Sequence, residues 1–259
     1  MTPLEYLYGR PERAVPALGL LFSILVGLAF QSLFWFAGTA IVLGGIWSYW
    51  SARLVIQDQR LGSIRLACPK SQVWLTFDDG PGPDTLEIVA TLNSFGCPAT
   101  FFFIGEQVER YVHLPELREA LRKGGHSVGN HSYSHPNFLS LSKQAALEEV
   151  EQAEALLQDA FPGMVLPLFR PPFGYRKAET FEVAGQLGLE VVGWSGNSLD
   201  FLDGPPERML RRLQAEVSPG DIVLFHDGRK DRGTTAGTLP GLLDWLKARG
   251  YPTYNGHSQ

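Results

Sequence analysis

Two adjacent carboxylates, Asp78 and Asp79, follow an apolar run at residues 73–77 and come directly before Gly80-Pro81. An apolar strand that ends in two acidic side chains brings negative charge to the rim of a hydrophobic core. This arrangement costs free energy unless a cation or a chemical role compensates for it. We therefore expect the functional site to lie at these two residues.

Two histidines, His131 and His135, lie four residues apart, just after a short segment that we expect to form a strand. Their imidazoles can reach one cation, and a carboxylate from another strand end completes a face of three ligands with positions left for water and substrate. One histidine pair at this spacing is weak evidence, but its coincidence with Asp78 and Asp79 favours a metal site. Two histidines and one carboxylate suit one divalent metal, Zn²⁺ first, with Co²⁺, Ni²⁺ or Fe²⁺ as alternatives.

Short apolar segments alternate with amphipathic helical patterns after residue 66. Continuous apolar runs are typical of parallel strands covered on both faces, and repeated strand–helix units predict a parallel α/β sheet, either open or closed into a barrel. The polar residues follow these strands, where α/β folds place their sites. The predicted strands are 73–77, 100–104, 127–129, 168–170, 190–194 and 222–225, and the predicted helices are 84–95, 142–161, 206–217 and 239–249.

Residues 14–52 contain no Asp, Glu, Lys or Arg. A single straight helix of this length would extend roughly 58 Å, nearly twice the ~30 Å hydrocarbon core of a bilayer. We therefore predict two short transmembrane helices near residues 15–31 and 33–50 that attach the chain to the lipid bilayer. A secretory signal followed by a core helix is the alternative, but the apolar stretch is too long and no small-residue cleavage site stands out.

Arginines flank this uncharged segment on both sides, at Arg10 and Arg13 before it and at Arg53 and Arg60 after it. By the positive-inside rule a hairpin keeps both ends on the cytoplasmic side of an inner membrane, whereas one long tilted span would put the following domain outside. The sequence thus predicts a membrane anchor with its linker in residues 1–65 and a catalytic domain in residues 66–259 that faces the cytoplasm.

The composition supports one sizeable domain beyond the anchor. The chain has 259 residues, 44% of them hydrophobic, and its net charge of −5 is the sum of +2 in residues 1–65 and −7 in residues 66–259. An acidic domain argues against nucleic acid as a partner. The two cysteines, Cys68 and Cys97, are too few for a disulfide framework and lack metal-ligand spacing.

Four segments, in this order, resemble the motifs of the polysaccharide deacetylase family, which is also known as the NodB homology domain and as carbohydrate esterase family four. They are residues 76–81, 131–135, 170–174 and 224–227, and the resemblance covers roughly residues 72–254. It implies a distorted (β/α) barrel that removes N-acetyl or O-acetyl groups from sugars with one bound divalent metal.

The resemblance also implies roles for single residues. Asp79, His131 and His135 match the metal ligands of the family. Asp78 matches the general base, which takes a proton from the water that attacks the acyl carbonyl group. Arg170 matches the residue that pairs with this base and keeps it ionised and oriented.

Further positions match groups that contact the substrate or the leaving group. The backbone N–H of Phe173 is expected to face the developing oxyanion. His226 resembles the general acid that protonates the leaving amine, and Asp200 resembles the acid that orients this histidine. Leu224 matches a wall of the acyl pocket. Phe201 stands where many relatives have tryptophan, so the chain keeps an aromatic wall but lacks the indole N–H.

Together these features predict a membrane-attached, metal-dependent hydrolase that removes an N-acyl group, with N-acetyl first, from an amino sugar of a glycan or of a lipid-linked saccharide. An O-acetyl esterase or a sugar deformylase on the same scaffold is an alternative. A catalytically silent sugar-binding module is a third, and the complete set of matched residues argues against it. The membrane segment favours a lipid-linked or envelope sugar over a free soluble polymer.

Overall fold

The structure is a computed structural model that describes residues 64–202, 204–228 and 232–257. These residues belong to a compact unit that runs from Ile64 to Gln259. The predicted transmembrane helices near 15–31 and 33–50 lie outside the described residues. Within the described part of the chain, no helix is both long and apolar enough to cross a membrane.

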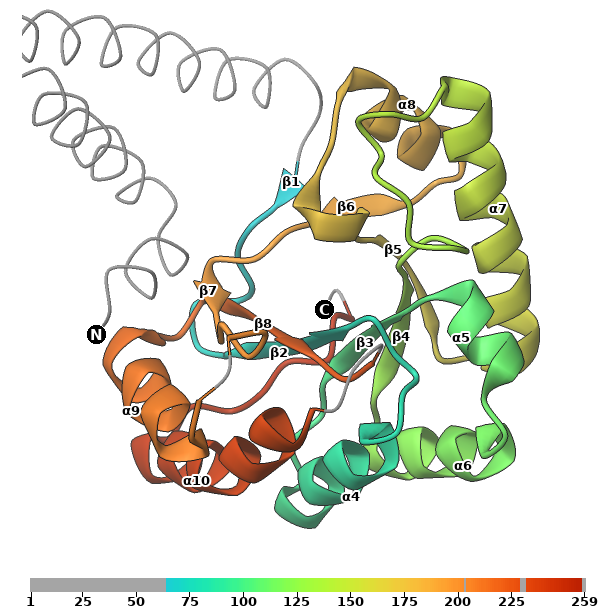
Figure 1. Cartoon of the computed structure of the whole chain (residues 1–259). Coiled ribbons are helices and arrows are strands. Elements are labelled where there is room, and N and C mark those ends of the chain that lie inside the picture. The colour runs from blue at the N-terminus through green and yellow to red at the C-terminus, as the bar shows by residue number, and fades with distance from the viewer. Residues whose placement is uncertain (1–63, 203, 229–231, 258–259) are drawn as a thin grey trace, which may run out of the picture. The chain divides into compact units, whose positions relative to one another are not determined.

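Eight parallel strands form one curled sheet in the order β1-β6-β5-β4-β3-β2-β8-β7 (Figure 1). The edge strands are β1 and β7, and in the described residues they do not pair with each other. Single backbone hydrogen bonds, such as that from Cys68 N–H to the Gly220 carbonyl, link the chain near these edges. The predicted parallel α/β sheet is confirmed, and it is a curled half-barrel. The strands are β1 (Ile64–Arg65), β2 (Trp74–Asp78), β3 (Thr100–Phe103), β4 (Ser127–Asn130), β5 (Val165–Phe169), β6 (Glu190–Val192), β7 (Gly196–Asn197) and β8 (Ile222–His226).

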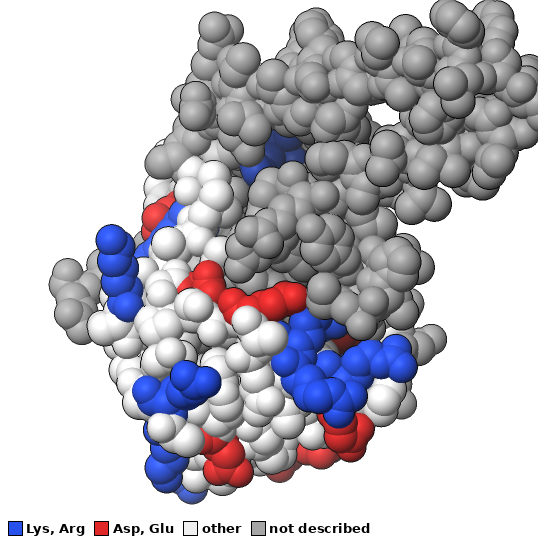
Figure 2. All heavy atoms as spheres, turned by 90° about the vertical axis from the view of Figure 1, so that its left-hand side faces the viewer, with Lys and Arg blue, Asp and Glu red and all other residues white. Residues whose placement is uncertain are grey.

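Helices surround the outer face of the curled sheet (Figure 1). Helix α10 packs against α9 and α4, and α7 packs against α5 and α8. On the face shown in Figure 2, basic and acidic side chains of the described residues lie near one another, so charges of opposite sign are interspersed there. The helices are α4 (Thr85–Phe95), α5 (Gly105–Arg110), α6 (Leu114–Gly124), α7 (Lys143–Ala160), α8 (Ala178–Gln186), α9 (Pro206–Glu216) and α10 (Gly233–Arg249), with a 3₁₀ turn, η1, at Pro172–Gly174.

The alternation of side chains along β2 directs two kinds of residue to opposite faces. Phe77 faces the helices, where its ring stacks on Phe101 and Phe225 with centroids 4.9 and 5.3 Å apart. Trp74 belongs to a second buried cluster on the inner face of the sheet. Asp78 shares that inner face, so the strand that anchors the core also presents a carboxylate to the interior.

All six predicted strands form, but several other elements were not predicted. Strands β1 and β7 have two residues each, too few for a periodic pattern. Helices α5, α6 and α8 were also missed. Helix α10 begins at Gly233 and not at the predicted residue 239, because Thr235, Ala236 and Thr238 are buried against the rest of the domain. Tertiary packing there overrides the low helix propensity of glycine and threonine.

Candidate metal centre

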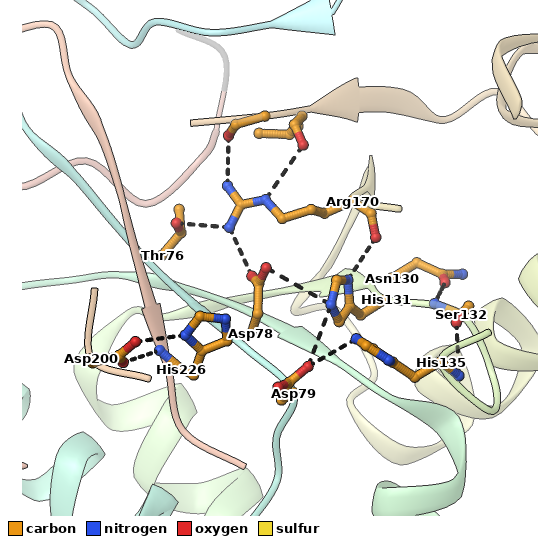
Figure 3. A network of polar contacts seen from close by, with 12 residues as sticks. Thr76, Asp78, Asp79, Asn130, His131, Ser132, His135, Arg170, Asp200 and His226 are labelled. Atoms are coloured by element: carbon orange, nitrogen blue, oxygen red, sulfur yellow. Dashed lines mark hydrogen bonds and ion pairs between the residues drawn. The ribbon is translucent and has the colours of Figure 1, made fainter. Parts of the chain in front are cut away.

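The polar residues singled out in the sequence meet at one rim of the curled sheet (Figure 3). Because all the strands are parallel, their carboxyl ends lie on the same side, which is where α/β folds build their sites. Residues that end or follow β2, β4, β5, β7 and β8 contribute to the cluster: Asp78, Asp79, His131, His135, Arg170, Asp200 and His226.

Asp79 has a backbone conformation that separates it from Asp78. Its φ angle of 75° lies in the left-handed region, which is uncommon for residues other than glycine. The chain that follows β8 passes so close that a Cβ atom at Gly228 would lie 2.0 Å from the Asp79 carbonyl oxygen. Glycine is therefore required at residue 228 to let this turn keep its shape.

Asp79, His131 and His135 bring three candidate ligand atoms together within 4.8 Å of one another, and all three residues are buried. The Oδ1 atom of Asp79 lies 3.1 Å from Nε2 of His135 and 3.6 Å from Nε2 of His131. Burial would raise the pKa of Asp79, but hydrogen bonds with the two histidines outweigh it and lower the pKa well below its ordinary value. A buried carboxylate that stays ionised between two imidazoles fits one divalent cation.

The orientation of His131 is fixed by a backbone contact. Its Nδ1 atom lies 2.6 Å from the carbonyl oxygen of Arg170, and because a carbonyl can only accept, Nδ1 carries the proton. The Nε2 atom is then the ring nitrogen that faces Asp79, 3.6 Å from its Oδ1, where it is available to bind a cation. Metal-binding histidines commonly show this pairing of a ligand nitrogen with a hydrogen-bonded partner nitrogen.

The turn between the two histidines is held by Glu149 of α7. Its carboxylate accepts hydrogen bonds from the backbone N–H of Tyr133 at 3.1 Å and from the backbone N–H and hydroxyl of Ser134 at 2.8 and 2.7 Å. Glu149 carries no distinguishing signal in the sequence, because it lies in a helix with several other acidic residues. It positions the loop and does not contact the candidate ligands directly.

Asp78 is bound to Arg170 on one side and faces the histidines on the other. The fully buried guanidinium donates to Asp78 Oδ1 at 2.7 Å, to Thr76 Oγ1 at 2.9 Å and to the Gly193 carbonyl oxygen at 2.8 Å. The second carboxylate oxygen of Asp78 lies 3.8 Å from Nε2 of His131. One oxygen of Asp78 is thus fixed while the other remains next to the candidate metal ligands.

His226 is oriented by Asp200. Its Nδ1 lies 2.7 Å from Asp200 Oδ1, and its backbone N–H and the hydroxyl of Thr235 both donate to Asp200 Oδ2. Burial would lower the pKa of His226, but the carboxylate of Asp200, followed by those of Asp79 and Asp78, raises it above its ordinary value. This arrangement favours the protonated form of the imidazole beside the two carboxylates at the end of β2.

Two aromatic side chains flank the cluster. Phe173, with a φ angle of 59°, is 55% exposed, and its ring centroid lies 4.6 Å from that of His135. Phe201 is 39% exposed, and its ring stands nearly perpendicular to His226 at 6.2 Å. Leu224 is buried within β8. The structure therefore places Phe173 next to His135 and Phe201 next to His226, and Leu224 in the strand that ends at His226.

The comparisons with known proteins agree with this site. The family model described as polysaccharide deacetylase matches residues 66–192. A peptidoglycan-N-acetylglucosamine deacetylase of Bacillus cereus is 33% identical over 180 residues, which are 68% of this chain and 82% of that protein. The chain belongs to the polysaccharide deacetylase family.

Two further relatives show the breadth of this family. A chitooligosaccharide deacetylase of Azorhizobium caulinodans is 28% identical over 201 residues, which are 73% of this chain and 94% of that protein. The solved structure of a carbohydrate esterase family four pseudoenzyme from Bacillus anthracis superposes with a TM-score of 0.66 at 27% identity, over 74% of this chain and 66% of that chain. The fold alone therefore does not settle activity, which depends on the site residues.

The first prediction concerns the metal ligands. Replacing either histidine, in His131→Ala or His135→Ala, should lower the affinity for Zn²⁺. The loss should exceed about 10–100-fold, which is typical when a residue that supports a ligand is changed. Metal analysis after equilibrium dialysis measures this loss. His113→Ala is the matched control, since that imidazole is exposed on the surface. Wild-type metal content in both ligand variants would contradict the assignment.

The second prediction concerns the protonation of His226. The substitution Asp200→Asn keeps a hydrogen-bond acceptor but removes the negative charge, so the pKa of His226 should fall from its raised value. The pH window in which the imidazole is protonated then ends at lower pH. Titration of the ring nitrogens by NMR measures the change, with Asp244→Asn on the exposed face of α10 as control. An unchanged His226 titration in the Asp200 variant would exclude the proposed coupling.

Proposed function

We propose that this chain is a metal-dependent carbohydrate deacetylase that removes an N-acyl group, with N-acetyl first, from an amino sugar. The observation that carries the proposal is the buried grouping of Asp79, His131 and His135 beside Asp78. Membership of the polysaccharide deacetylase family supports a hydrolase, because relatives of this chain are named as deacetylases of amino-sugar polymers.

The proposed metal centre uses Asp79, His131 and His135 as protein ligands. One divalent cation, with Zn²⁺ first and Co²⁺, Ni²⁺ or Fe²⁺ as alternatives, would polarise the acyl carbonyl and acidify water. Three protein ligands leave coordination positions open, as hydrolytic sites require. The donor set of the described residues fits this chemistry.

The residues around the centre divide the proton transfers between them. Asp78 accepts a proton from the attacking water through the oxygen that faces His131, because Arg170 occupies its other oxygen. His226, whose pKa is raised by Asp200, donates a proton to the leaving amine nitrogen. In this proposal the proton acceptor and the proton donor are different side chains.

The substrate contacts are proposed from residues near this cluster. The backbone N–H of Phe173 is assigned to the developing oxyanion, and Leu224 to a wall of the acyl pocket. Phe201 supplies an aromatic wall next to His226. A phenyl ring can pack against an acyl or sugar face but cannot donate a hydrogen bond, so recognition at this wall is apolar.

An O-acetyl esterase or a sugar deformylase would use the same centre. The raised pKa of His226 favours the amide, because an amine leaves only when it is protonated, whereas an alcohol leaves more easily. A silent sugar-binding module would have no need for the Asp78–Arg170 and His226–Asp200 pairs. These pairs support the enzyme over the module.

The glycan is proposed to be an envelope polysaccharide or a lipid-linked saccharide. The named relatives act on peptidoglycan and on chitooligosaccharides, which both carry N-acetylglucosamine units. The apolar segment 14–52 supports an encounter with sugars at a membrane.

Incubation of the purified full chain with Zn²⁺ and a panel of acylated amino sugars, read by mass spectrometry, tests the function. The expected result is a mass decrease of about 42 units, which corresponds to one acetyl group replaced by hydrogen. No decrease with any substrate would overturn the proposal.

The third prediction separates metal binding from proton transfer. Asp78→Asn should keep the metal content of the wild type, because Asp78 is not among the proposed ligands, but should lower kcat by about 10²–10⁴-fold, since an amide cannot act as the base. Metal analysis and initial rates on the same preparation measure both quantities. Near wild-type kcat with normal metal content would show that another group takes the proton.

The fourth prediction concerns the side of the membrane. We propose that residues 15–31 and 33–50 form a transmembrane hairpin and that the catalytic domain faces the cytoplasm, because arginines flank both ends of the uncharged segment. Fusions of alkaline phosphatase and of a fluorescent protein after residue 65 and at the C-terminus report the side. Bright fluorescent protein with inactive phosphatase is expected at both places. The reverse pattern would rule out the hairpin and favour an external polysaccharide.

A further inference from the structure

A second buried arginine, Arg232, approaches the candidate metal centre from the start of α10. It is only 6% exposed, and its NH2 atom lies 3.6 Å from Oδ2 of Asp79. This is the oxygen that does not face the histidines, since Oδ1 lies nearest to His131 and His135. The two oxygens of Asp79 therefore have different partners.

The position of Arg232 is fixed by contacts that do not involve Asp79. Its Nε donates to the carbonyl oxygen of Gly228 at 3.1 Å, and its backbone N–H donates to the carboxylate of Asp84. Gly228 in turn packs directly against the backbone of Asp79, where a Cβ atom would not fit. The guanidinium is thus aimed at Asp79 by a local structure that exists without the ion pair.

A carboxylate can bind a cation through one oxygen or through both, and each mode uses a different number of coordination positions. A guanidinium next to Oδ2 competes with the cation for that oxygen. We propose that Arg232 is a positioning residue that restricts Asp79 to metal ligation through Oδ1 alone. The position that Oδ2 would otherwise occupy stays open for water or for the acyl oxygen.

The arrangement gives each of the two adjacent carboxylates its own buried arginine. Arg170 holds Oδ1 of Asp78, and Arg232 faces Oδ2 of Asp79. In each pair the arginine takes one oxygen and leaves the other toward the histidines. Arg232 carries no signal in the sequence, because an arginine at the start of a helix is an ordinary surface residue unless the fold buries it.

This inference rests on the proposed metal centre, and its test uses a spectroscopic readout that does not require turnover. The full chain is loaded with Co²⁺, and its visible absorption is compared between wild type, Arg232→Met and Arg232→Lys. Arg249→Met, an exposed arginine on the same helix, is the control. In Arg232→Met we expect Asp79 to bind through both oxygens, so the higher coordination number should weaken the visible band by about 2-fold or more. Arg232→Lys, which keeps a cation, should restore most of the wild-type band.

The possible outcomes are distinct. A wild-type band in Arg232→Met would overturn the inference, and so would a weakened band that Arg232→Lys does not restore. If Arg232→Met does not fold, Arg232→Gln takes its place, with thermal unfolding as the check, and the same comparison with lysine decides. If the wild-type protein shows no Co²⁺ band, or shows one that persists in His131→Ala, the metal centre itself is contradicted. A normal band without deacetylation would contradict the proposed reaction while leaving the Arg232 comparison valid.

Discussion

The site depends on a single constraint, which is that two consecutive buried carboxylates must be kept apart and compensated. Two unit charges 4 Å apart repel by about 4 kcal/mol at an effective dielectric constant of about 20. The left-handed backbone of Asp79 turns its side chain toward the histidines, while Asp78 stays on the inner face of β2 with Arg170. Gly228 packs closely against this turn, where a Cβ atom would not fit.

The strands and the cluster of polar residues were predictable because both depend on local patterns. Continuous apolar runs identify buried parallel strands, and parallel strands bring their carboxyl ends to one rim. The sequence therefore indicated that Asp79, His131 and His135 would meet, although they are far apart in the chain. The two-residue strands β1 and β7 could not be predicted, because they form only where neighbouring strands offer free backbone groups.

Glu149 and Arg232 show where sequence reasoning stops. Both have residue types that are common on helix surfaces, and neither lies in a segment with a recognisable motif. Their roles arise from the approach of another segment: the turn at residues 133–134 meets Glu149, and the end of β2 meets Arg232. Such contacts depend on the packing of α7 and α10 against the sheet, which no local pattern specifies.

Arg170 serves the site twice, since its side chain binds Asp78 and its backbone carbonyl accepts from His131. The same residue at the end of β5 thus orients both the proposed proton acceptor, Asp78, and the candidate ligand His131. A change of side chain at residue 170 removes only the first contact, whereas a shift of the strand end disturbs both. For protein engineering, this means that an exchange of loops around the site should leave the end of β5 unchanged in its position relative to Asp78 and His131.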